Sequence, residues 1–215
     1  MIFNKKPANT PAAVIERIEK QFPMPKGEIQ RLEGRRWILN LVPKGGIGAE
    51  IGVFRGHFSD LICRIAAPRK LYLIDPWTTI GPTFGWGKEY TNFDTLTTAA
   101  ARDHARAHVE QHENVECVVI EDLYPKCKDL IREPLDFAYL DASHNYAPTL
   151  NELRHLTTQV KPGGVIIGDD WAPDPKAQHH GVFRAVQDFV ASSDWQIIAA
   201  GPAAQWAIRH KPSYA

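Results

Sequence analysis

Two short apolar segments that end in aspartate constrain the fold of this chain most strongly. Residues 137–140 (FAYL) precede Asp141, and residues 165–167 (VII) precede Asp169 and Asp170 after one glycine. Such short apolar runs are typical of strands buried on both faces of a parallel sheet. The segment between them has room for one crossover helix, which predicts parallel strands whose carboxyl ends share one edge. Three carboxylates are therefore expected where open α/β sheets bind ligands.

Strand and helix patterns alternate from residue 47 onward, which predicts a doubly wound α/β sheet. Helical apolar stripes are expected over residues 58–66 and 182–190, and an Ala-rich helix is expected over about residues 95–108. The tail reads as two strands joined by a short turn, so the parallel sheet should end in an antiparallel hairpin. The predicted strands comprise residues 47–51, 71–74, 115–120, 137–140, 165–167, 195–200 and 205–209.

The chain is expected to consist of an amino-terminal helical flank, residues 1–45, and one α/β domain, residues 46–215. Helical spacing places Val14, Ile15, Ile18 and Phe22 on one face of a first helix. A second helix should end at Pro43 and present Ile29, Leu32, Trp37 and Leu41 on one face. The flank is expected to pack on the domain or on a partner subunit, which predicts a homo-oligomer as one outcome.

The overall charge and the cysteine content exclude several classes of protein. Equal numbers of basic and acidic residues, 25 of each, argue against nucleic-acid binding through phosphate contacts. No segment has the apolar length of a membrane span or a secretion signal. Cys63, Cys117 and Cys127 are expected to be buried free thiols in a reducing compartment. These features predict a cytoplasmic protein with no membrane partner.

A glycine-containing turn after the first strand predicts a ligand site. Gly52 and Gly56 allow the backbone to approach a ligand closely, and Asp75 ends the second strand, where an acid can accept both hydroxyls of a ribose. The spacing differs from the dinucleotide pattern G-x-G-x-x-G, and Glu50 would repel a diphosphate. An acid suits a ligand that carries an ammonium and a sulfonium, which favours S-adenosylmethionine. A turn that merely needs small residues remains the alternative.

Five segments carry a resemblance to a known family: AEIGVFRG, LYLIDPW, LDFAYLDASHNY, KPGGVIIGDDW and GVFRAVQDF. Between about residues 48 and 190 the chain resembles class I S-adenosylmethionine-dependent methyltransferases, and more narrowly the macrocin, rhamnosyl and other sugar O-methyltransferases. The resemblance implies seven strands in the order 3-2-1-4-5-7-6, with the last antiparallel. It also implies a cofactor site whose residues are Glu50, Gly52, Val53, Gly56, Asp75 and Asp122.

The resemblance implies that Asp141, Asp169 and Asp170 hold a divalent metal. Carboxylate ligands without cysteine favour Mg²⁺, Ca²⁺ or Mn²⁺. A metal bound to a substrate hydroxyl would lower the pKa of that hydroxyl and orient it for methyl transfer. His144 is the first candidate for the base that takes the proton, because imidazole titrates near neutral pH, and Asp141 is the second.

Simpler interpretations of the same residues remain open. Asp141 and residues 143–145 could cap a helix that begins near Pro148, and Asp169 and Asp170 could open a loop. The aromatic loop 76–93 could be a lid over the substrate or a surface loop packed on the first helices. His179 and His180 could reach the site from another loop.

The predicted function is metal-assisted O-methylation of a small hydroxylated molecule, and the expected substrate class is a sugar or a sugar-bearing metabolite. The alternatives are an NAD-dependent oxidoreductase and a non-catalytic domain that binds S-adenosylmethionine.

Overall fold

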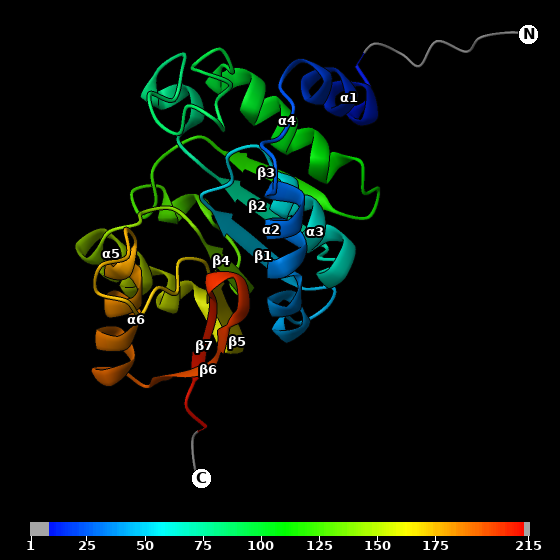
Figure 1. Ribbon diagram of the computed structural model, residues 1–215. Coiled ribbons are helices and arrows are strands. Elements are labelled where there is room, and N and C mark those ends of the chain that lie inside the picture. The colour runs from blue at the N-terminus through cyan, green and yellow to red at the C-terminus, as the bar shows by residue number, and fades with distance from the viewer. Residues whose placement is uncertain (1–8, 213–215) are drawn as a thin grey trace, which may run out of the picture.

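Seven strands form one mixed sheet in the order β3-β2-β1-β4-β5-β7-β6. The computed structural model describes residues 9–212 (Figure 1). Strands β1 to β5 pair in parallel, and β7 pairs antiparallel with both β5 and β6, so the predicted order and antiparallel last strand are confirmed. The strands are β1 (Ile47–Ile51), β2 (Lys70–Ile74), β3 (Glu116–Ile120), β4 (Leu135–Leu140), β5 (Val160–Gly168), β6 (Trp195–Gly201) and β7 (Gln205–His210).

The largest difference from the predicted strands is the start of β5. It begins at Val160 rather than at residue 165, and α5 (Tyr146–Gln159) runs directly into it. The pairing of β4 with β5 shifts register between Leu135 and Phe137, where the Pro162–Gly164 segment interrupts the regular ladder. Proline and glycines indicate a turn in sequence, although here they lie within the strand.

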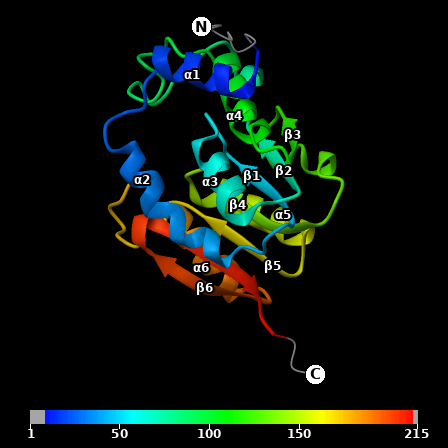
Figure 2. The same ribbon diagram turned by 90° about the vertical axis from the view of Figure 1, so that its right-hand side faces the viewer.

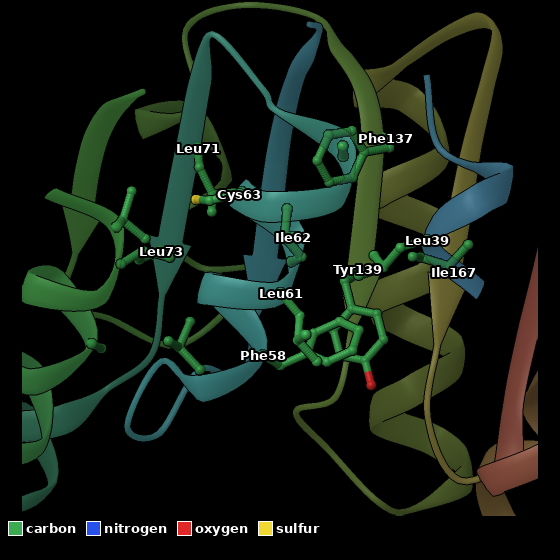
Figure 3. Packing of buried hydrophobic residues seen from close by; sticks show 14 of the residues in the cluster. Leu39, Phe58, Leu61, Ile62, Cys63, Leu71, Leu73, Phe137, Tyr139 and Ile167 are labelled. Carbon is green, nitrogen blue, oxygen red and sulfur yellow. The ribbon is translucent and has the colours of Figure 1, made fainter. Parts of the chain in front are cut away.

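Helices cover both faces of the sheet (Figure 1). One face carries α3 (His57–Ala66), α4 (Thr98–Glu110) and a 3₁₀ helix, η1 (Arg36–Leu41), and the other carries α5 and α6 (His180–Ala191). Side chains alternate along each strand, so Phe137 and Tyr139 of β4 face α3, whereas Ala138 and Leu140 face α5. Figure 3 shows the first of these two cores, in which the ring of Tyr139 packs against that of Phe58 with centroids 4.1 Å apart.

The amino-terminal helices contribute to the core on the face of the sheet that carries α3 and α4. Helix α1 (Pro11–Gln21) lies along α4 (Figure 2), and its Ile18 and the following Phe22 are buried. Helix α2 (Glu28–Arg35) is shorter than predicted and continues as η1. The prediction that Ile29 lies on the packed face is wrong, since 66% of Ile29 is exposed. The buried residue of α2 is Arg35, because the helix turns this side chain toward the acidic sheet edge.

Cys63, Cys117 and Cys127 are free thiols, as predicted, and Cys63 and Cys127 are buried.

Within residues 9–212, no helix has both the length and the apolar character needed to cross a membrane.

Candidate active site

A cleft of about 780 Å³ lies at the carboxyl ends of β1, β2 and β4. This volume is in the range that holds a cofactor and a small substrate. The predicted cofactor residues that line it are Glu50, Gly52, Val53, Asp75 and Asp122, and Asp141, His144 and Asp170 line its acidic side. The cleft is also lined by Arg31 and Arg35 of α2 and by His179 from the loop before α6.

The two glycines of the loop after β1 have different roles. Gly52 has φ +85°, and a Cβ there would lie 1.9 Å from the carbonyl oxygen of Asp141, so only glycine lets these two loops meet at the cleft. Gly56 also has a positive φ, +80°, but a Cβ there would lie 2.5 Å from the Cα of Ala105 on α4. Gly56 is outside the lining of the cleft. Its position therefore favours a packing role, and its predicted contact with the cofactor stays a prediction.

Glu50 lies at the floor of the cleft and is 1% exposed. Ser59 of α3 donates a hydrogen bond from its hydroxyl to one carboxylate oxygen of Glu50. Burial, reinforced by the nearby charges of Asp141 and Asp75, raises the pKa of Glu50 to about 8. A cationic ligand beside Glu50 would stabilise its ionised form and recover part of that desolvation cost.

We expect Glu50→Gln to weaken S-adenosylmethionine binding by about 10- to 100-fold, the usual loss for one charged hydrogen bond. The amide is isosteric and keeps an oxygen for Ser59, so the thermal midpoint without ligand should be unchanged or higher. Isothermal titration calorimetry and thermal unfolding measure the two quantities. Equal affinity of the variant and the native protein would place the cationic end of the cofactor elsewhere.

Asp75 organises the cofactor loop through its carboxylate. One oxygen accepts hydrogen bonds from the amides of Val53 and Phe54, both at 2.9 Å, and the other accepts one from the amide of Trp77 at 3.2 Å. The second oxygen keeps a lone pair for a ribose hydroxyl. Asp122 is more exposed and contacts Lys126 at 3.0 Å. Both carboxylates line the cleft, and their predicted contacts with a cofactor stay predictions.

The structure divides the three aspartates that were predicted to share a metal. Asp169 is 3% exposed, and its Oδ2 pairs with the guanidinium groups of Arg35 and Arg31. Its Oδ1 accepts a hydrogen bond from the side-chain amide of Gln205 at 2.6 Å. Asp141 also faces Arg35, whose Nη1 lies 3.3 Å from its Oδ2. Arg35 therefore supplies the positive charge that the buried carboxylate of Asp169 requires, and it also pairs with the partly exposed carboxylate of Asp141.

The donor set does not fit a three-carboxylate cation site in this arrangement. Both oxygens of Asp169 are bound by side-chain donors, and Asp169 does not line the cleft. A cation there would have to displace Arg31 and Arg35 and would meet their charge. This arrangement of Asp141, Asp169 and Asp170 leaves no set of free carboxylate oxygens for a metal, and Mg²⁺ at this position stays a prediction.

Asp170 points in the opposite direction, toward two histidines. Its φ of +65° is a left-handed conformation that aspartate tolerates better than most residues. Its Oδ2 lies 2.5 Å from Nδ1 of His144 and 2.8 Å from Nδ1 of His179. The two imidazole rings stack with centroids 4.5 Å apart. The bond to Asp170 raises the pKa of His144 and leaves its Nε2 free to accept a proton.

The aromatic loop between β2 and α4 both packs on the domain and lines the cleft. Trp77 is fully buried and donates its ring N–H to the carbonyl of Phe54 at 2.8 Å. Phe84 and Trp86 contact the ring of Phe54, at centroid distances of 5.0 and 5.2 Å, and both line the cleft. Phe93 is 71% exposed. The loop thus lines the cleft, whereas its closure over a substrate and its packing on the first helices stay predictions.

Sequence reasoning missed Arg31 and Arg35 and gave His179 little weight. The arginines lie in α2, more than 100 residues before the aspartates that they contact, so only the tertiary fold brings them together. The sequence contained one signal for this pairing. Arg31 and Arg35 are four residues apart and so lie on the same face of a predicted helix, and the acidic residues at the sheet edge needed a counter-charge. His180 bonds the carbonyl of Ala172 and is outside the lining of the cleft.

Comparison with known proteins agrees with the fold and the cleft. A family model described as a methyltransferase domain matches residues 49–171, more than half of the chain. The O-methyltransferase TomG from Streptomyces achromogenes, solved with S-adenosylmethionine, has a similar structure, with a TM-score of 0.55 and 14% sequence identity. The match covers 98% of this chain and 93% of the TomG chain. An O-methyltransferase from Bacillus cereus, solved with S-adenosylhomocysteine, gives TM-score 0.55, 16% identity and coverage of 97% and 93%. A comparison with curated proteins found no match.

The chain therefore belongs to the methyltransferase domain family. It is an S-adenosylmethionine-dependent methyltransferase with the seven-stranded sheet of class I enzymes. This family assignment removes the NAD-dependent oxidoreductase as an interpretation of the glycine loop and Asp75.

Proposed function

We propose that the protein transfers a methyl group from S-adenosylmethionine to a hydroxyl of a small molecule, with His144 as the base. The observation that carries the proposal is the His144–Asp170 pair, which lines the same cleft as Glu50 and the Gly52 loop. The two similar enzymes are O-methyltransferases, which supports oxygen as the atom that is methylated.

The chemistry needs one bond exchange and one proton acceptor. The acceptor oxygen attacks the sulfonium methyl, the carbon–sulfur bond breaks as the carbon–oxygen bond forms, and S-adenosylhomocysteine leaves. Nε2 of His144 takes the hydroxyl proton, while Asp170 holds the ring through Nδ1 and stabilises the imidazolium. The cleft contributes mainly by positioning the two reactants in line.

A small acceptor with a partly apolar surface suits the walls of the cleft. Phe84, Trp86 and Tyr90 offer ring faces on one side, and the polar groups of His144, His179 and Asp141 lie on the other. Aromatic faces stack on sugars and on planar rings. A sugar or a sugar-bearing metabolite, as in the macrocin and rhamnosyl O-methyltransferase group, is the substrate class that we propose.

The proposal is tested by incubating the protein with S-adenosylmethionine and a panel of sugars, glycosides and catechols. Release of S-adenosylhomocysteine that depends on one acceptor class, with a methyl ether identified by mass spectrometry, would support it. Methylation at nitrogen or carbon only, or binding of the cofactor with no transfer to any hydroxyl, would contradict it.

Metal assistance by Asp141, Asp169 and Asp170 is a further prediction about the mechanism. It requires Arg31 and Arg35 to release Asp169. We expect that adding Mg²⁺ to enzyme passed over a chelating resin changes the initial rate less than about twofold, because Arg35 already supplies the positive charge. A rate that depends on Mg²⁺ and is lost in Asp169→Asn would instead show that a cation displaces the arginines from Asp169.

The same assay at several protein concentrations would test the homo-oligomer predicted through the amino-terminal helices.

A further inference from the structure

Three histidines and one glutamate converge where α1, α3 and α4 meet. Glu19 comes from α1, and His57 is the first residue of α3. His104 and His108 are four residues apart on α4, so both lie on the same side of that helix. Figure 2 shows α1 beside α4 at this end of the molecule. None of the four residues takes part in the proposed methyl transfer.

The donor atoms of the four side chains have nearly the spacing of a metal site. Oε1 of Glu19 lies 3.4 Å from Nε2 of His57, 3.9 Å from Nε2 of His104 and 4.0 Å from Nε2 of His108. All four donor atoms lie within 4.8 Å of one another. The ligand atoms of a tetrahedral zinc ion with bonds of about 2.0–2.1 Å lie about 3.3 Å from one another. The distances between the donor atoms here would therefore have to shorten by less than about 1.5 Å to bind the ion.

Four of the buried ring nitrogens in this cluster have no hydrogen-bond partner. His104 is 0% exposed and His108 is 6% exposed. Nε2 of His57, Nε2 of His104 and both nitrogens of His108 lack a hydrogen-bond partner. Unpaired buried polar atoms are rare in folded proteins and cost stability unless a ligand satisfies them. Several such atoms directed at one point indicate a missing common partner.

The charge state of the histidines suits a metal. Burial, with the neighbouring imidazoles, lowers the pKa of His104 to about 2, and burial lowers that of His108 to about 4. Both rings are therefore neutral at physiological pH, which is the form that binds metals. The close contact with His57, at 3.4 Å, lowers the pKa of Glu19, so this residue contributes a carboxylate.

Arg55 is the group that opposes a cation here. Its Nη2 donates to the carbonyl of Phe22 at 2.7 Å, and its Nε lies 3.4 Å from Nδ1 of His104. Ligation through Nε2 would place the ring proton on Nδ1, so this long contact would have to open. The contact is at the limit of a hydrogen bond, and little is lost with it.

We propose that Glu19, His57, His104 and His108 bind one Zn²⁺ ion per chain and that the ion fastens α1 to α3 and α4. Three imidazoles and one carboxylate in a closed, four-ligand arrangement suit structural zinc rather than Mg²⁺ or Ca²⁺. His57 directly follows Gly56, so the ion would also hold the end of the cofactor loop.

The test uses the full chain, purified without a histidine tag, stripped with a chelator and then incubated with Zn²⁺. After desalting, mass spectrometry of the metal content should give one zinc per chain. The thermal midpoint should rise by about 5–10 °C when free Zn²⁺ is 100 times its dissociation constant. Co²⁺ in the same site should show the strong visible bands of four-coordinate cobalt.

The variant Glu19→Gln/His57→Asn separates this site from the other histidine cluster. It removes two ligands at the partly exposed rim, so folding is preserved, and we expect both zinc retention and the thermal shift to be lost. His112→Asn, just beyond α4, is the matched control and should keep both. His144→Asn/His179→Asn should also keep one zinc. Zinc retained by Glu19→Gln/His57→Asn, lost from His144→Asn/His179→Asn, or absent from the native protein would overturn the proposal.

Discussion

His144→Ala is expected to lower kcat by about 100- to 10,000-fold, the usual range for removal of a general base. Binding of S-adenosylmethionine should stay within about threefold of the native value, because His144 lies on the acidic side of the cleft and contacts Asp170 rather than the cofactor loop. Turnover assays and calorimetry measure the two effects separately. His155→Ala, on helix α5 and outside the lining of the cleft, is the control and should retain native turnover.

The pH dependence of the rate gives a second measurement of the same role. Only the neutral form of His144 accepts a proton, so the rate should rise with pH as His144 loses its proton at a pKa raised by Asp170. In Asp170→Asn the carboxylate that raises the pKa of His144 is removed, so the rise of the rate with pH should occur at lower pH. Asparagine tolerates the positive φ at this position, which keeps the backbone unchanged.

An unchanged acid limb in Asp170→Asn would assign the titration to another group. Loss of cofactor binding in His144→Ala, in parallel with loss of turnover, would indicate that the histidine supports the cleft and is not the base. Both results would contradict the mechanism proposed for this pair.

Arg35→Met is expected to destabilise the protein by about 3–5 kcal/mol, because it leaves buried Asp169 without its main counter-charge. For a chain of this size the thermal midpoint should fall by about 6–20 °C. Methionine has a similar length and fills the space of the arginine side chain. The loss of stability therefore measures the removal of the charge and not the creation of a cavity. Thermal and urea unfolding at neutral pH measure it.

Two further variants check the cause of that loss. Arg36→Met alters the next residue, which is 56% exposed at its side chain, and should change stability by no more than about 0.5 kcal/mol. Adding Asp169→Asn to Arg35→Met replaces the unpaired charge with a neutral amide and should recover part of the stability. If Arg35→Met unfolds no more easily than Arg36→Met, the ion pair contributes nothing and Asp169 is protonated in the folded state.

The sheet could be predicted closely because its strands carry local signals. Apolar runs that end in acid or glycine located β1, β2 and β4 to within two residues at each end. The early start of β5 was missed because Lys161-Pro162-Gly163-Gly164 has the composition of a turn. In α2 the apolar spacing was misleading: Ile29 was predicted to be buried and is exposed, whereas Arg35, a charged residue, is buried by its partners.

The sequence by itself determined the class of fold, the cofactor edge and the residues that gather there, since each follows from local patterns and from the rules that connect parallel strands. The tertiary structure decided which of these residues interact. It paired Asp169 and Asp141 with arginines from a helix at the other end of the chain, and it directed Asp170 to two histidines. It also brought Glu19 to three histidines on other helices. Such pairings depend on how separate elements pack, and charge pairs over long sequence distances leave no periodic signal in the chain.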